Sequence, residues 1–283
     1  MTRLADIPDT SAKAGILTKS NAASSGALAQ LRAAWADQAV LTGAEQILPA
    51  DRTHLEKPRV ATTLTYDEYI AELADLLPDS RLHLSLCPQP WIGNPATARV
   101  IVLMLNPGLG PMDYYAEISS AKNEEYLAAL HRNLLGHPSE YPFFFLDPQF
   151  IWHPGATYWH RRFDWMIGEL AKHGMSVAAS TKFIAREVCC MQLVPYHSAN
   201  FRLGDAFVNS LKSTKLAKAS ARELAKEESR KIVVMRAQDL WSIPESDNVA
   251  LAEDAHRRSA FLTRGSSHGD AILEHLQRLR RDS

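Results

Sequence analysis

The stretch VIVLMLNPGLGPMDYY, residues 100–115, decides the fold class of this chain. Its first six residues are all apolar and lead directly into Asn-Pro-Gly. A strand with one wet face alternates polar and apolar residues, so a uniform run indicates a strand that is buried on both faces of a parallel sheet. Asn106 then follows a buried strand, either as a turn former or as the working residue of an active site.

Working outward, apolar runs alternate with helical patterns along the rest of the chain. The runs at 100–106, 187–194, 231–236 and 260–263 predict four strands. Helical spacing of apolar residues predicts helices over 119–135, 157–173, 204–228 and 269–281. We therefore expect a doubly wound α/β fold, with three layers in α/β/α order and a central, mainly parallel four-stranded sheet. Ligands of such sheets bind beyond the carboxyl ends of the strands.

The region before this pattern predicts added helices. Residues 1–23 are rich in Ser, Thr, Ala and Lys and lack periodicity, so we expect them to be loosely held. Apolar spacing predicts a helix over 25–47, and the capping box from Thr65 to Glu68 predicts a second helix that ends at Pro78. We expect residues 1–80 to form an N-terminal helical extension packed on a domain of residues 81–283.

Composition excludes several classes of protein. The 283 residues are 46% hydrophobic and 22% charged, with a formal net charge of -1. Because the net charge is near zero, any contact with nucleic acid depends on a local basic patch. No apolar run has the length of a signal peptide or of the roughly 20 residues that span a bilayer. We expect a cytoplasmic monomer with no membrane contact.

The three cysteines give no sign of a metal or redox site. Cys87, Cys189 and Cys190 have no C-x-x-C spacing, and adjacent residues of a strand point to opposite faces. We expect all three to be reduced and buried. An iron–sulfur cluster usually needs four thiolates, so a cluster held only by cysteines is excluded within one chain. We expect no metal and no cofactor.

The loops that follow the expected strands carry polar groups suited to a base or a phosphate. They read NPGLGPMDYY (106–115), PYHSANF (195–201), RAQDLW (236–241) and TRGSSHGD (263–270). Each also has a structural interpretation. Asn-Pro-Gly is a common turn, and Ser266 or Ser267 is suited to cap the last helix. Small residues at a helix N-terminus can also bind an anion.

Three segments of the chain resemble a known family. LNPGLG (105–110) resembles the first active-site motif of the uracil-DNA glycosylase superfamily, in the branch of mismatch-specific uracil and thymine glycosylases. HPGATYWHRRFDWMIGEL (153–170) is similar to a segment of that branch that leads into an aromatic-Trp helix. FLTRGSSHGDAILEHL (261–276) resembles its final motif, a Ser-containing loop that enters the minor groove. The resemblance covers about residues 98–282.

The resemblance implies catalytic roles for three residues. Base excision breaks the C1′–N bond through a transition state with oxocarbenium character, and the base leaves as an anion. Asn106 is expected to orient the attacking water through its carboxamide oxygen, although an amide cannot remove a proton. His197 is expected to stabilise the departing anion, with His268 as the alternative.

The resemblance also implies a pocket for a base that has been flipped out of the helix. We expect it to be formed by Gly108, Tyr115, Phe144, Phe145 and Gln192. The fastest uracil enzymes of the family carry Tyr where this chain has Gly108, and their ring excludes 5-substituted pyrimidines. Gly108 therefore implies an open pocket for a modified base. Phe144 and Phe145 are both candidates for stacking on it, and Gln192 for reading its edge.

Double-stranded DNA with a flipped base is the expected partner. Its phosphates are expected to contact the final loop and one lysine, namely Arg264, Gly265, Ser266, Ser267 and Lys212. The resemblance thus implies a monofunctional DNA glycosylase that excises a modified or mismatched base, expected to be a 5-substituted pyrimidine, in repair or in defence against phage with modified DNA. The alternatives are a catalytically silent nucleic-acid-binding module of the same fold and a nucleotide or small-molecule hydrolase.

Overall fold

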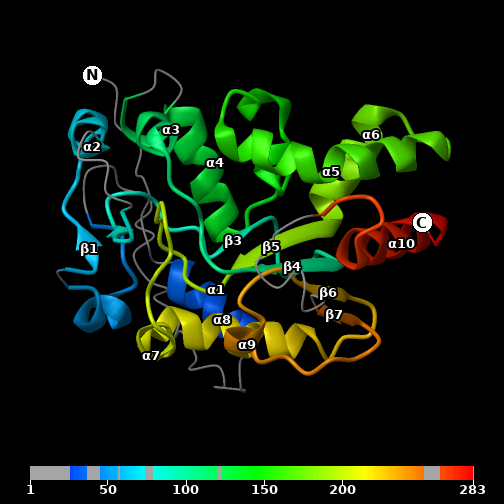
Figure 1. Ribbon diagram of the computed structural model, residues 1–283. Coiled ribbons are helices and arrows are strands. Elements are labelled where there is room, and N and C mark those ends of the chain that lie inside the picture. The colour runs from blue at the N-terminus through cyan, green and yellow to red at the C-terminus, as the bar shows by residue number, and fades with distance from the viewer. Residues whose placement is uncertain are drawn as a thin grey trace, which may run out of the picture.

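A five-stranded sheet forms the centre of the molecule (Figure 1). The structure is a computed structural model, and it describes residues 26–36, 45–56, 58–73, 79–119, 123–251 and 262–282. The strands are β3 (Trp91–Ile92), β4 (Val100–Met104), β5 (Val188–Gln192), β6 (Lys231–Val234) and β7 (Val249–Leu251). Their order is β3-β5-β4-β6-β7, and β3 alone runs antiparallel to its neighbour. The chain therefore has an α/β fold with a mostly parallel sheet.

Two details of the expected sheet are wrong. The sheet has five strands rather than four, because the two residues of β3 add an antiparallel edge. The last parallel strand is β7 rather than 260–263, since Leu262 and Thr263 are not in a strand and residues 260–261 lie outside the described residues. A strand of three residues is too short for periodicity to distinguish it from a loop.

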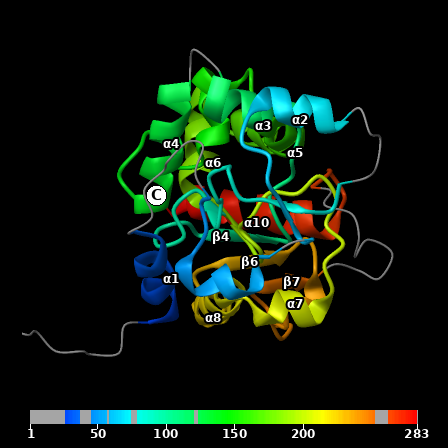
Figure 2. The same ribbon diagram turned by 90° about the vertical axis from the view of Figure 1, so that its left-hand side faces the viewer.

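Side chains alternate between two apolar clusters, one on each face of the sheet. In β4, Val100, Val102 and Met104 join one cluster, and Ile101 and Leu103 join the other. The first cluster is covered by α4 (Asn123–Leu135), α5 (Pro154–Lys172), α6 (Val177–Glu187) and α10 (Ser267–Arg281). The second is covered mainly by α1 (Ala27–Ala36) and α8 (Lys212–Leu224), which lie below the sheet in Figures 1 and 2. Burial of both faces explains the uniformly apolar strand.

The expected helix over 204–228 is two helices, α7 (Asp205–Ser210) and α8. Leu211 between them has an extended backbone, with ψ of 134°. The buried carboxylate of Asp51 accepts hydrogen bonds from the Lys212 and Ser213 amides and so caps α8 from a distant part of the chain. A cap that comes from 161 residues away has no signature in the local sequence. Helix α6 was not predicted.

The N-terminal region packs directly on the core. The capping box is confirmed, because the Glu68 amide donates to Thr65 Oγ1 and the Thr65 amide donates to the Glu68 carboxylate at the start of α2 (Tyr66–Leu73). The helix expected over 25–47 extends only over α1 in the described residues, and 45–48 are not helical. A 3-10 turn, η1 (Pro49–His54), and a parallel pair, β1 (Val60–Ala61) and β2 (Leu82–His83), follow. Residues 1–23 and 74–78 lie outside the described residues.

Several short elements complete the upper layer of Figure 1. They are α3 (Pro111–Tyr114), a π-helical turn η2 (Tyr115–Ser119), and the 3-10 turns η3 (Phe144–Leu146) and η4 (Pro148–Phe150). The three cysteines are free and buried, as predicted, and Cys189 and Cys190 join opposite clusters.

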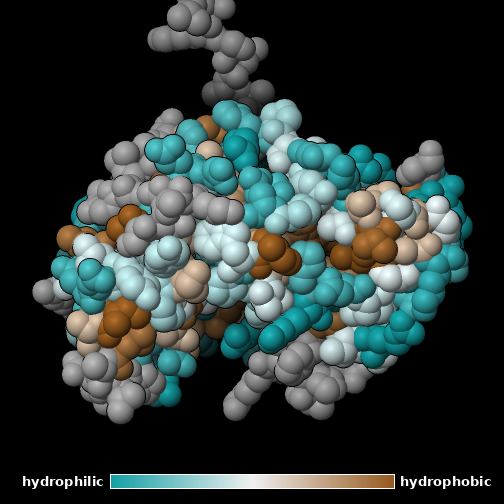
Figure 3. Space-filling view, turned by 90° about the horizontal axis from the view of Figure 1, so that it is seen from above, coloured by the Kyte–Doolittle hydropathy of each residue, from teal (hydrophilic) through white to brown (hydrophobic). Residues whose placement is uncertain are grey.

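The surface shown in Figure 3 is largely hydrophilic, with hydrophobic residues in small separate groups. Among the described helices, none combines the length and the apolar character that crossing a membrane requires.

Candidate active site at the strand ends

A pocket of about 560 Å³ opens at the carboxyl ends of β4, β5 and β6. Five of the residues that the sequence singled out line it, namely Asn106, Gly108, Phe145, Gln192 and His197. The parallel pairing of β4 with β5 brings Asn106 and Gly108 beside Gln192 and His197, which lie more than 80 residues later in the chain. The volume lies in the range of pockets that bind small molecules and leaves room for a substituted base.

Asn106 is held firmly by its amide group. Its nitrogen donates to the carbonyl oxygens of Pro107 (2.8 Å) and Tyr196 (3.3 Å) and to Ser198 Oγ (2.9 Å). Carbonyl oxygens accept hydrogen bonds only, so they determine which end of the carboxamide carries the nitrogen. In the described part of the chain no group donates to the carboxamide oxygen, which is therefore able to accept a hydrogen bond from water.

The same contacts explain why this position carries Asn rather than Asp. An aspartate would place a carboxylate oxygen against the carbonyls of Pro107 and Tyr196, where it has no proton to donate. Such acceptor–acceptor contacts are repulsive. The loop therefore selects a neutral side chain that positions a ligand but does not take up a proton.

His197 ties two loops together. Its Nδ1 lies 2.8 Å from the Gly108 carbonyl oxygen, and its Nε2 lies 3.2 Å from the Cys87 carbonyl oxygen. A neutral imidazole can donate through only one of its nitrogens, and here both are turned toward the main chain. This placement favours a role in holding the 106–110 loop over the expected contact with a departing base.

Gln192 and Phe145 supply a polar edge and an aromatic wall. Gln192 is the last residue of β5, is 4% exposed, and has a buried Oε1 with no hydrogen-bond partner in the described residues. A buried acceptor without a donor is unfavourable unless a ligand supplies one. Phe145 stacks on His153 (centroids 5.2 Å apart) and lines the pocket, whereas Phe144 lines a different hollow beside α4. The structure thus separates two phenylalanines that the sequence did not.

Two of the three glycines that line the pocket have opposite surroundings. A Cβ on Gly108 would meet nothing within 4 Å, and the backbone φ there is not in the left-handed region. A Cβ on Gly155 would lie 2.5 Å from the Phe145 ring. Gly108 therefore leaves open space that a larger side chain can fill, while Gly155 is required for the aromatic wall to approach α5.

Several residues that were not predicted also line the pocket, and they lie in the segments 106–115 and 153–170. Asp113 lines the pocket from α3, and Tyr158 and Trp159 line it from α5. The Asp113 carboxylate accepts a hydrogen bond from the Gly110 amide (2.7 Å), and its other oxygen lies 3.7 Å from His153 Nε2. Burial lowers the pKa of His153, and the nearby Asp113 only partly opposes this. The pair thus places one carboxylate and one neutral imidazole beside the pocket.

Three expected site residues lie elsewhere. Tyr115 packs its ring against Tyr66 (centroids 5.8 Å apart) and does not line the pocket. His268 is buried near the start of α10. Lys212 begins α8 on the opposite face of the sheet, with its amide bound to Asp51.

The expected DNA-contacting loop is closed on itself and on α5. Ser266, as one of the two caps considered, accepts from the Gly269 amide, and its hydroxyl donates to the Thr263 carbonyl. The Gly265 amide donates to Asp270, and Ser267 begins α10. Arg264 forms an ion pair with Glu169 of α5. The 153–170 and 261–276 segments therefore do meet, and Arg264 shares the Glu169 carboxylate with Lys172.

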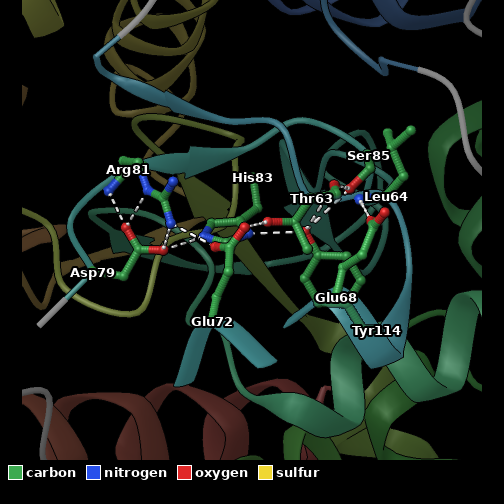
Figure 4. Close-up of polar contacts among 9 residues, drawn as sticks. All are labelled: Thr63, Leu64, Glu68, Glu72, Asp79, Arg81, His83, Ser85 and Tyr114. Carbon is green, nitrogen blue, oxygen red and sulfur yellow. Dashed lines mark hydrogen bonds and ion pairs between the residues drawn. The ribbon is translucent and has the colours of Figure 1, made fainter. Parts of the chain in front are cut away.

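A second polar network adjoins the site through the main chain (Figure 4). The buried His83 lies 2.8 Å from Asp79 through Nε2 and 2.8 Å from the Tyr114 hydroxyl through Nδ1. Arg81 donates to the carboxylates of Asp79 and Glu72. The His83 amide donates to the His197 carbonyl (2.9 Å), so the network supports the loop that borders the pocket.

Within the described residues, no three His, Cys, Asp or Glu side chains are grouped to hold a metal ion. Comparisons with protein-family models, with characterised proteins and with solved structures find no match for this chain. The function must therefore be argued from the motifs and from the geometry of the pocket.

Proposed function

We propose that this protein is a DNA glycosylase that binds an extruded modified base in the strand-end pocket and hydrolyses its N-glycosidic bond. The observation that carries the proposal is the arrangement of Asn106, whose nitrogen is locked by three acceptors while its oxygen faces no protein donor in the described residues. A carboxamide held in this way accepts a hydrogen bond from one water and fixes its position. Positioning of this kind lowers the barrier because reactants start near the attack geometry.

The base is held by the walls of the same pocket. Phe145 offers a ring on which a planar base can stack, and Gln192 Oε1 offers an acceptor for an exocyclic amino group or a ring N–H. Open space at Gly108 accommodates a substituent on the pyrimidine 5-carbon. These features support a 5-substituted pyrimidine as the substrate.

Hydrolysis replaces the C1′–N bond of the nucleotide with a C1′–O bond. The water oxygen forms a bond to C1′ while the C1′–N bond breaks. The electron pair of the broken bond leaves with the base. The attacking water loses one proton, which Asn106 cannot accept. Among the described residues that line the pocket, Asp113 carries the one carboxylate, and we assign it the role of proton acceptor.

The proposal is tested by mass spectrometry of bases released from defined duplexes that contain uracil, mismatched thymine, hydroxymethylcytosine or glucosylated hydroxymethylcytosine. The wild type is expected to release at least one of them. Asn106→Ala is expected to lower the release rate by at least about 100-fold while DNA affinity stays within a few-fold, because the water is lost but the base walls remain.

Gln149→Ala is a matched control, since this exposed side chain lies outside the pocket. It should release bases at the wild-type rate. Full activity in Asn106→Ala, or release of no base by the wild type, contradicts the proposal. Cleavage of free nucleosides but not of DNA would instead favour a nucleoside hydrolase.

A further inference from the structure

The strand-end pocket continues into a second hollow. The neighbouring hollow has a volume of about 620 Å³ and shares Pro154 and Tyr158 with the pocket. Its remaining lining comes from Trp152, Thr157, Arg161, Arg162, Leu262 and Thr263. Both hollows therefore belong to one groove, which runs from the end of β4 past the first turns of α5 to the loop before α10. We call it the α5 groove.

Arginines line the α5 groove along its length. Arg202 and Arg236 line the pocket end, and Arg161 and Arg162 line the other end. Asp113 is the one carboxylate among the described lining residues of both hollows, and it already accepts from the Gly110 amide. The groove thus concentrates positive charge in a chain whose formal net charge is only -1.

Three of these arginines have no acidic partner in the described part of the chain. Arg161, Arg202 and Arg236 are exposed, and none forms an ion pair there. Elsewhere Arg81, Arg230 and Arg264 do form ion pairs with carboxylates. Adjacent like charges without a counterion are unfavourable in the isolated protein, and a bound anion relieves that cost.

Arg162 and Tyr158 form the floor between the two hollows. The Arg162 guanidinium lies 3.3 Å from the centre of the Tyr158 ring and donates to the Tyr158 carbonyl oxygen (2.8 Å). Burial raises the pKa of Tyr158, and the charges of Arg162 and Arg236 partly offset this rise. Tyr158 thus lines the pocket together with Arg236 and carries Arg162 on its ring, so arginines from α5 and from the loop after β6 lie near the same side chain.

The main chain holds Arg236 at the pocket by a strained turn. The next residue, Ala237, has a left-handed backbone (φ 56°, ψ 40°), a conformation that is unfavourable for a residue with a Cβ. The short helix α9 (Gln238–Trp241) follows, and its buried Trp241 donates to the Met104 carbonyl oxygen at the end of β4 (3.0 Å). Strain kept in place by a buried anchor is typical of functional sites.

We propose that the α5 groove binds the phosphodiester backbone of DNA next to the extruded nucleotide, through Arg161, Arg202 and Arg236. The inference rests on the proposed function and replaces the expected phosphate contacts of Arg264 and Lys212. Guanidinium groups suit this role because their planar N–H donors match the oxygens of a phosphate. Exposed arginines line the base pocket at one end of the groove and the second hollow at its other end, which matches a strand that leaves the pocket along α5.

The test measures binding of a fluorescent duplex with a tetrahydrofuran abasic site over a series of salt concentrations. Each of R161Q and R236Q is expected to weaken binding several-fold for any flanking sequence. Each should reduce the slope of log affinity against log salt by about 0.9, the value for one lost phosphate contact. Thermal unfolding followed by circular dichroism checks that these exposed substitutions leave the fold intact.

K226Q is the matched control, because it also removes one exposed positive charge. Lys226 lies between α8 and β6, just before β6 begins, whereas the groove lies at the carboxyl ends of the strands. The K226Q variant should therefore keep the wild-type slope. Unchanged affinity and slope in both R161Q and R236Q overturn the groove, as does a wild type that does not bind DNA. If the groove variants behave as wild type while bases are still released, the groove fails and the proposed function stands. If the duplex binds through these arginines with the expected salt dependence but no base is released, the groove stands and the proposed function fails.

Discussion

The strand-end pocket and the His83 network are neighbours built from similar residue types, yet their polar groups are satisfied very differently. In the His83 network both ring nitrogens, the Asp79 carboxylate and the Tyr114 hydroxyl have hydrogen-bond partners. In the pocket, Gln192 Oε1 is buried without a partner in the described residues, and the Asn106 oxygen meets no donor there. Satisfied polar networks make a fold rigid, whereas an acceptor that lines a pocket and has no donor is available to a ligand. The comparison teaches that a cluster of titratable residues is not by itself an active site.

The largest expected effect comes from filling the pocket. Gly108→Tyr places a ring in open space without backbone strain, so the protein is expected to fold normally. The ring occupies the space beside the pyrimidine 5-carbon, and release of 5-substituted bases should fall by at least about 100-fold, while uracil is less affected. Side-by-side release assays on uracil and glucosylated hydroxymethylcytosine duplexes measure the difference.

Gly168→Tyr is the control for this substitution. It adds the same ring at another glycine with nothing within 4 Å, on α5 but outside the pocket. It should change neither activity. If the Gly108→Tyr variant still releases the bulky base at the wild-type rate, the strand-end pocket does not bind the base. The contrast between the pocket and the His83 network is then wrong.

A smaller effect is expected from the satisfied network. Tyr114→Phe leaves His83 Nδ1 and Ser85 Oγ without the phenolic partner, and the free energy of unfolding should fall by about 1–3 kcal/mol. Gln192→Leu, its counterpart in the pocket, removes an oxygen that already lacks a partner and should leave stability unchanged or higher. Urea unfolding measures both, and base release should fall only in Gln192→Leu. Equal destabilisation by the two substitutions contradicts the distinction between the regions.

The smallest expected effect is a change in acid sensitivity. Burial alone would raise the pKa of Asp79, but hydrogen bonds from Arg81 and His83 outweigh it and lower the pKa from 3.8 to about 2. The ionised carboxylate therefore stabilises the fold above pH 3.8, and this contribution disappears as the pH falls toward 2. Asp79→Asn should be less stable than the wild type near neutral pH, and the difference should shrink in that acid range.

His83 adds a second acid-sensitive contribution. Burial lowers its pKa below the ordinary value of 6.5, so the folded state favours the neutral ring and loses stability as the pH falls below 6.5. This loss should remain in Asp79→Asn, which separates the two groups. Unfolding curves at several pH values test both, and a constant difference between wild type and variant at all of them contradicts the assignment to Asp79.

Much of the fold could be predicted because its causes are local. A strand buried on both faces must be apolar throughout, so Val100–Leu105 revealed the centre of the sheet. The period of two along a strand separated Cys189 from Cys190 without any structure. The rule that ligands bind at the carboxyl ends of parallel strands pointed to the loops 106–115 and 195–201, and Asn106 and His197 from these loops line the pocket.

Other features depend on contacts between distant residues, and only the tertiary structure decided them. Asp51 divides an expected helix because its carboxylate caps α8 from the other end of the chain. Phe145 rather than Phe144 faces the pocket because the η3 turn directs neighbouring rings to different hollows. Arg264 pairs with Glu169, which also pairs with Lys172, whereas Arg236 has no acidic partner in the described residues. Local sequence determines burial and periodicity, but which charges and rings remain available to a ligand depends on what the fold brings beside them.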